Sequence, residues 1–125
     1  MKAHIQKAIK KLLVYGLTQT EYANLQAAAA QKQIICKKIN DQQTCLKVGQ
    51  LLSEENPVSA SELALNGKFA LLSGFGKEIE DCLNIINGAA QGVIKAVATP
   101  HNIEWKFSDL CAAVSEEYRV MTKAE

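Results

Sequence analysis

The sequence has few of the residues that interrupt helices, and they are missing from one long stretch. Glycine and proline are absent from Thr18 to Val48, a segment made mainly of Ala, Gln, Lys, Ile and Leu. A continuous helix over these positions would be about 45 Å long at 1.5 Å per residue, well beyond the ~8–20 residues typical of globular helices. A compact core cannot cover such a helix, so this stretch predicts a helical bundle or an antiparallel coiled coil.

Aromatic residues are also scarce. They make up 6% of the chain, whereas the hydrophobic fraction is 48%. This balance favours closely packed helices over a sheet, because strands favour β-branched and aromatic residues. We therefore expect residues 1–125 to form one all-α domain, either an antiparallel three- or four-helix bundle or a long helical hairpin coiled coil. Residues 99–125 are expected to form a mobile or partner-binding tail.

Arginine is nearly missing, since Arg119 is the only one, and the formal net charge is +1. Nucleic-acid-binding domains usually carry a basic excess, and arginine makes most bidentate contacts to phosphates and bases. The composition therefore argues against a nucleic-acid partner. No apolar run reaches the ~18 residues that span a bilayer, and residues 1–16 lack the features of a signal peptide. We expect a cytoplasmic protein without a membrane span.

The cysteines are not arranged for metal binding. No C-x-x-C pair occurs, and no histidine stands at ligand spacing from any of the four. The sequence also lacks a P-loop, a G-x-G-x-x-G motif and a G-x-S-x-G motif. We therefore expect reduced, mostly buried thiols, no metal, no cofactor and no enzymatic activity. The four thiols are Cys36, Cys45, Cys82 and Cys111.

Local signals divide the chain into helical segments. Thr18 and Glu21 have the spacing of a capping box, which places a helix start at this point. Pro57 forces the residue before it out of the helical region, so the first long helix should end there. A second long helical tract is expected to run to about Ala98. Ser108 can cap a terminal helix.

The terminal segment combines aromatic side chains with an apolar stripe at helical spacing. Aromatic residues are favoured in interfaces because they supply a large contact area at little cost in entropy. Such a segment predicts either a helix that docks on a protein partner or a cap that folds back on the bundle. The candidate partner-binding residues are Trp105, Phe107, Leu110, Val114, Tyr118 and Met121.

Neither histidine defines a catalytic site. His4 begins an H-x-x-K pattern that resembles histidine phosphotransfer domains, but it lies at a chain end, where helices fray. His101 has Glu104 and Asp109 nearby in the sequence, without a defined nucleophile or oxyanion donors. A histidine phosphotransfer bundle and a structural coiled-coil oligomerisation module are the alternative functions.

The order of the segments resembles FlgN, the family of flagellar type III export chaperones for hook-junction proteins. One matching stretch is Leu17–Glu55, which contains Tyr22, Leu25, Ala29 and Ile35 and ends in Leu-Leu-x-Glu-Glu. The other is Ile79–Val93, with Cys82, Leu83, Asn84, Ile86 and Ala89. The resemblance implies a cytosolic chaperone whose terminal amphipathic segment binds the C-terminal helix of a secreted client, packed helix-in-groove. A homo-oligomer is a further possible assembly.

Overall fold

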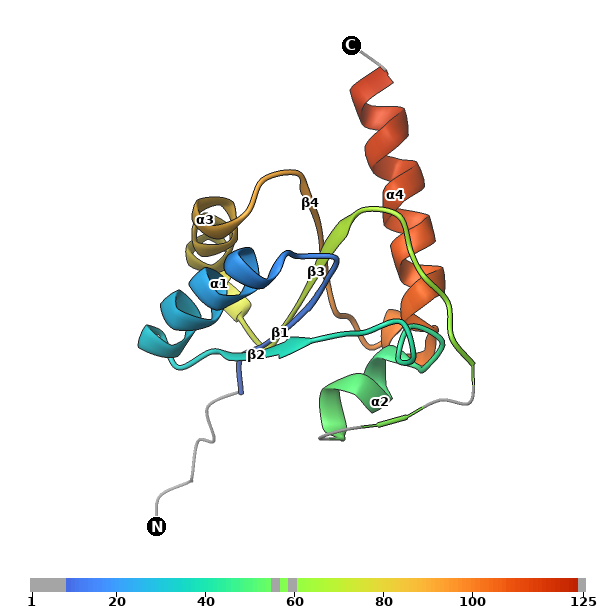
Figure 1. Cartoon of the computed structure of the whole chain (residues 1–125), viewed down its shortest axis with the longest axis horizontal. Helices are drawn as coiled ribbons and strands as arrows, with labels where there is room; N and C mark the ends of the chain where they lie inside the picture. Colours follow the sequence, from blue (N-terminus) through green and yellow to red (C-terminus); the bar gives the residue numbers. More distant parts are fainter. Residues whose placement is uncertain (1–8, 55–56, 59–60, 124–125) are drawn as a thin grey trace.

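The chain forms an α/β fold with a four-stranded mixed sheet, and the predicted all-α bundle is wrong (Figure 1). The structure is a computed structural model that describes residues 9–54, 57–58 and 61–123. The strands are β1 (Lys11–Tyr15), β2 (Ile35–Lys38), β3 (Lys68–Ser73) and β4 (Val93–Val97). The helices are α1 (Gln19–Gln31), α2 (Val48–Ser53), α3 (Ile79–Ala89) and α4 (Phe107–Lys123), with short 3-10 turns at Gly76–Glu78 and Asn102–Glu104.

Two βαβ units build the sheet, whose strand order is β2-β1-β3-β4. β1 pairs with β2 in parallel through the α1 crossover, and β3 pairs with β4 in parallel through α3. The units meet at an antiparallel pairing of β1 with β3, centred where Leu13 lies opposite Leu71. An approximate two-fold axis through this pair therefore relates the two halves of the sheet.

A hydrophobic core lies on each face of the sheet. Leu12 and Val14 point from β1 toward α1 and α3, whereas Leu13 and Tyr15 point toward α2 and α4. All four side chains are at most 7% exposed. A strand that is buried on both faces appears as a continuous apolar run rather than an alternating one, and this accounts for the sequence Leu-Leu-Val-Tyr.

The predicted long helices are interrupted by strands. The capping box is confirmed: the Glu21 N–H lies 3.1 Å from Thr18 Oγ1, and the Thr18 N–H lies 2.9 Å from Glu21 Oε1. However, α1 ends at Gln31, and the chain turns through Gln33, whose φ is 60°, into β2. The second predicted tract contains β3 and β4 as well as α3. Pairing between distant strands overrides local helix propensity here, so neither a coiled coil nor a helical bundle forms.

Gly16 and Gly74 occupy equivalent places after β1 and β3. Their φ angles are +85° and +84°, in the left-handed region that favours glycine. A Cβ at Gly16 would lie 2.2 Å from the Gly67 carbonyl oxygen, and one at Gly74 would lie 2.3 Å from the Ile9 carbonyl oxygen. Glycine therefore allows the backbone to pass closely at both ends of the central strand pair.

We expect Gly16→Ala to lower the free energy of unfolding by about 1–3 kcal/mol, because it adds strain at a positive φ and a clash with backbone. Gly88→Ala is the matched control, since a Cβ there meets nothing within 4 Å in α3. The control should leave stability unchanged or raise it by up to about 1 kcal/mol. Urea unfolding followed by circular dichroism measures both variants, and an equal loss in the two would contradict this role for Gly16.

Candidate interaction surface

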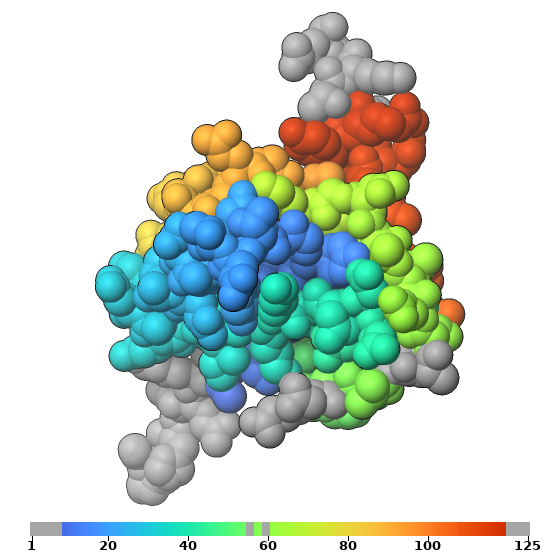
Figure 2. All heavy atoms as spheres, viewed as in Figure 1, coloured from blue at the N-terminus to red at the C-terminus, as the bar shows by residue number. Residues whose placement is uncertain are grey.

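One stripe of α4 side chains runs from the hydrophobic core to the protein surface. Its 17 residues correspond to about 25 Å of helix. Phe107 and Leu110 are buried in the core shared with β1 and β3, whereas Val114 is partly buried and Tyr118 is 53% exposed. Figure 1 shows the C-terminal end of α4 extending beyond the other elements, and the red atoms of α4 protrude at the same place in the space-filling view (Figure 2).

A shallow groove lies where α4 passes the first residues of β4. Its volume is about 270 Å³. Its walls are apolar apart from one cation, Lys95, and one anion, Glu117. The lining residues are Val93, Ile94 and Lys95 from β4 and Val114, Glu117 and Tyr118 from α4.

The backbone of β4 presents hydrogen-bonding groups beside this groove. The Ala98 N–H donates to the Leu72 carbonyl at 2.8 Å, so the backbone groups of Ala98 face β3. These groups alternate sides along a strand, so the N–H and C=O groups of Ile94 and Ala96 also face β3. The N–H and C=O groups of Val93 and Lys95 consequently point outward from the sheet edge, on the side away from β3. An edge strand with such groups is a template for pairing with another chain.

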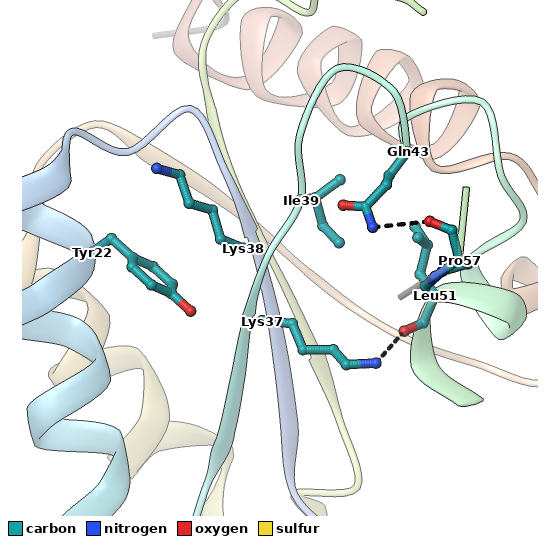
Figure 3. A pocket seen from close by; sticks show the side chains of 7 residues that line it. All are labelled: Tyr22, Lys37, Lys38, Ile39, Gln43, Leu51 and Pro57. Atoms are coloured by element: carbon teal, nitrogen blue, oxygen red, sulfur yellow. Dashed lines mark hydrogen bonds between the residues drawn. The ribbon is translucent and has the colours of Figure 1, made fainter. Parts of the chain in front are cut away.

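A second hollow, of about 300 Å³, lies beside β2 between α1 and α2 (Figure 3). Lys37 Nζ donates to the Leu51 carbonyl at 3.0 Å and to the Glu54 carbonyl at 2.5 Å. The Gln43 side-chain amide donates to the Pro57 carbonyl at 3.1 Å. These side chains hold the end of α2 and Pro57 beside β2, so we interpret this hollow as a structural junction.

Tyr22 covers the backbone edge of β2 in the same region (Figure 3). Its hydroxyl donates to the Cys36 carbonyl at 3.2 Å, which is one of the outward-pointing groups of that strand. Lys38 Nζ lies 5.7 Å from the centre of the Tyr22 ring, within the range of a cation–π contact. The β2 edge is therefore shielded by side chains of its own half of the molecule.

The structure divides the six candidate partner-binding residues. Phe107 and Leu110 belong to the core, and Trp105 is partly buried beside it. Val114 and Tyr118 line the groove together. The side chain of Met121 lies outside the described residues. A binding role for the exposed members stays a prediction, whereas the first half of the segment packs on the sheet.

The β4 wall of the groove was not found from the sequence. A signal was present, because Val93–Val97 is a short run rich in β-branched residues between Gly92 and Pro100. Such a run, bounded by turn residues, is typical of a strand. This strand signal was missed because residues up to about Ala98 were predicted to form one continuous helical tract.

The residues weighed for catalysis do not assemble into a site. Within the described ranges, no group of three or more His, Cys, Asp or Glu side chains is placed to hold a metal ion. His101 is exposed and packs edge-on against Trp105, with ring centres 5.5 Å apart. His4 lies outside the described residues.

The four cysteines are free thiols; Cys82 and Cys111 are buried, and Cys36 and Cys45 are partly exposed. Burial raises the pKa of the Cys36 and Cys111 thiols to about 12. Burial also raises the pKa of Cys82, to about 11. Thiols in such surroundings are poor nucleophiles, because the thiolate is the reactive form.

We expect iodoacetamide at about pH 8 to leave Cys82 and Cys111 unmodified in the native protein. Their raised pKa values hold the thiolate fraction at about 10⁻³ or less, and burial blocks access. In urea, all four cysteines should react, as counted by peptide mass spectrometry. Rapid native modification of Cys111 would show that α4 detaches from the sheet in solution.

One family model matches the chain, and its description is "Domain of unknown function (DUF3783)". The match covers residues 68–121, from the start of β3 into α4, and therefore both walls of the groove. No curated protein matches the sequence, and no solved structure does. None of these comparisons links the chain to FlgN. Across the part of the chain that the structure describes, every helix is too short or too polar to cross a membrane.

Proposed function

We propose that this protein is a non-catalytic interaction module that binds another protein in the groove between β4 and the second half of α4. The observation that carries the proposal is the stripe on α4, which begins in the core at Leu110 and continues through Val114 to the exposed Tyr118. The buried end fixes the helix on the sheet. The exposed end presents an aromatic anchor in a fixed position, and preorganised aromatic anchors dominate many protein interfaces.

The groove supplies two kinds of contact to a partner. Val114 and Tyr118 offer apolar area, and burial of side chains of this size contributes about 1.5–3 kcal/mol each. The outward backbone groups of β4 offer main-chain hydrogen bonds, as in recognition by strand addition. The two contributions lie side by side, because Val93 and Lys95 line the same groove as Tyr118.

A role in flagellar export is not part of this proposal. The resemblance to FlgN implied a helical bundle, and the mixed sheet removes that basis. The bundle-based alternatives, a histidine phosphotransfer domain and a coiled-coil oligomerisation module, lose their structural basis for the same reason. The expectation of a protein partner is retained, since it rested on the spacing of residues that lie on α4.

Site-specific photo-crosslinking tests the proposal. A photoreactive phenylalanine analogue at position 118, in cells that express the full chain, should give a defined protein adduct. The same analogue at Gln26, an exposed residue of α1 on the opposite face of the sheet, is the matched control and should not give it. Absence of a position-specific adduct would overturn the proposal.

With the adduct identified and purified, Tyr118→Asp should weaken its binding about 10-fold or more, because apolar burial is lost and a charge is placed in the groove. Adding Val114→Asp should weaken binding further. Tyr118 is exposed, so the single variant should keep the wild-type unfolding midpoint, and Gln26→Asp should change neither quantity. Unchanged affinity in Tyr118→Asp would contradict this assignment of the surface.

A further inference from the structure

We infer that the partner binds this surface through an extended segment that pairs with β4 as an added strand and places an acidic residue, flanked by apolar ones, opposite Lys95. This inference rests on the proposed function, because it uses the same groove and specifies the chemistry of the partner. Three features carry it: the open backbone edge of β4, the charge of Lys95 and the apolar wall of α4.

The two edges of the sheet differ in how their backbone is covered. On β2, the Tyr22 hydroxyl donates to the Cys36 carbonyl at 3.2 Å. On β4, Asn102 Nδ2 donates to the Val97 carbonyl at 3.1 Å, which covers only the far end of the strand. Within the described residues, no protein group bonds the outward N–H and C=O groups of Val93 and Lys95. An extended segment can pair with these groups, whereas a helix satisfies its own backbone internally, so the open edge favours an extended partner.

The side chains of β4 alternate between the two faces of the sheet. Val93 belongs to the core beneath α1 and α3, so Lys95 shares that face, whereas Ile94 belongs to the core beneath α4. A strand added at this edge continues the alternation, because directly opposite residues of neighbouring strands lie on the same face. One face of the added segment therefore meets Lys95, and the other meets Val114 and Tyr118.

Lys95 differs from the other lysines of the four strands in its contacts. Each of the others has a partner, which is a backbone carbonyl, an aromatic ring or a carboxylate. These lysines are Lys11, Lys37, Lys38 and Lys68. Lys68 is the nearest comparison, because it lies beside Val93 on the face of Lys95 and its Nζ is 2.7 Å from Glu21 Oε2. In the part of the chain that the structure describes, the Lys95 side chain has no such carboxylate. An acidic residue opposite Lys95 on an added strand would supply one.

The α4 wall determines the residues on either side of this acidic residue. Their side chains lie on the opposite face, where Val114 and Tyr118 offer apolar area. Glu117 lies in the same wall, so an acidic residue on this face would meet a like charge. The two faces together therefore select the order apolar, acidic, apolar, with the acidic residue restricted to the face of Lys95.

NMR titration of the full, isotopically labelled chain with short peptides tests the inference. The probe is acetyl-Ser-Thr-Val-Glu-Val-Thr-Ser-amide, and its matched control has Lys in place of Glu. We expect the Glu peptide to shift the amide signals of Val93–Val97 and Tyr118, and to bind at least about 5-fold more tightly than the control. Lys95→Glu should reverse this preference, and Lys95→Met should abolish it. Lys32→Glu, at the exposed C-cap of α1, is the control variant and should leave it unchanged. The same spectra verify that each variant is folded.

Methylation of the peptide backbone tests the strand pairing itself, because it removes a main-chain donor and leaves every side chain in place. In an antiparallel pair, the residue opposite Lys95 exchanges both hydrogen bonds with it, whereas in a parallel pair the bonds go to the residues on either side. One peptide is therefore N-methylated at Glu and another at both Val residues. One of the two should bind at least about 5-fold more weakly than the other. Equal affinities of the two methylated peptides would contradict strand addition.

The remaining outcomes separate this inference from the proposed function. If neither peptide binds up to about 1 mM, the range of weak association, and position 118 still gives a defined adduct, only the acidic-segment inference is overturned. The adduct then identifies the actual occupant, whether a helix of another protein or a second copy of this chain. Absence of both peptide binding and an adduct overturns both. Equal affinity for the Glu and Lys peptides, or shifts at the β2 edge in place of β4, contradicts the pairing with Lys95.

Discussion

The antiparallel pairing of β1 with β3 is the contact on which the whole structure depends. Both strands are buried on both faces, and their side chains supply the centre of each core. Every helix packs on one of those cores. Within the sheet, β2 pairs only with β1, and β4 pairs only with β3. A change that weakens the central pair therefore acts on both cores at once, whereas a change on β2 or β4 acts on one edge.

The approximate two-fold symmetry of the sheet is not continued by the segments around it. α2 and α4 cover the same face, but α2 has 6 residues and α4 has 17. Tyr15 adds to the difference: its hydroxyl donates to Asp41 and accepts from the Leu65 N–H, which ties a loop to the β1 end of the sheet. The pKa of Tyr15 is raised, mainly by burial and then by the hydrogen bond to Asp41. The β2 half is thereby enclosed by loops, and the β4 half keeps its open groove.

The sequence predicted the local features of this fold better than its architecture. The capping box at Thr18 and the apolar stripe of α4 were found because they depend on spacing within one helix. β1 was missed because an apolar run of four residues does not distinguish a buried strand from a turn of helix. β2 was missed because an edge strand with two lysines has little apolar pattern. The groove could be predicted only on its α4 side, since its other wall depends on pairing between β3 and β4.

The central position of β1 has a consequence for biosynthesis. The chain is made from its N-terminus, so β1, α1, β2 and α2 are synthesised before β3 exists. Until then, the buried run Leu12–Tyr15 has no neighbour on the side that β3 later occupies. An apolar strand with an unpaired edge invites association between nascent chains. In the interval between synthesis of Tyr15 and of Phe69, its partner across the sheet, this apolar edge is therefore unpaired.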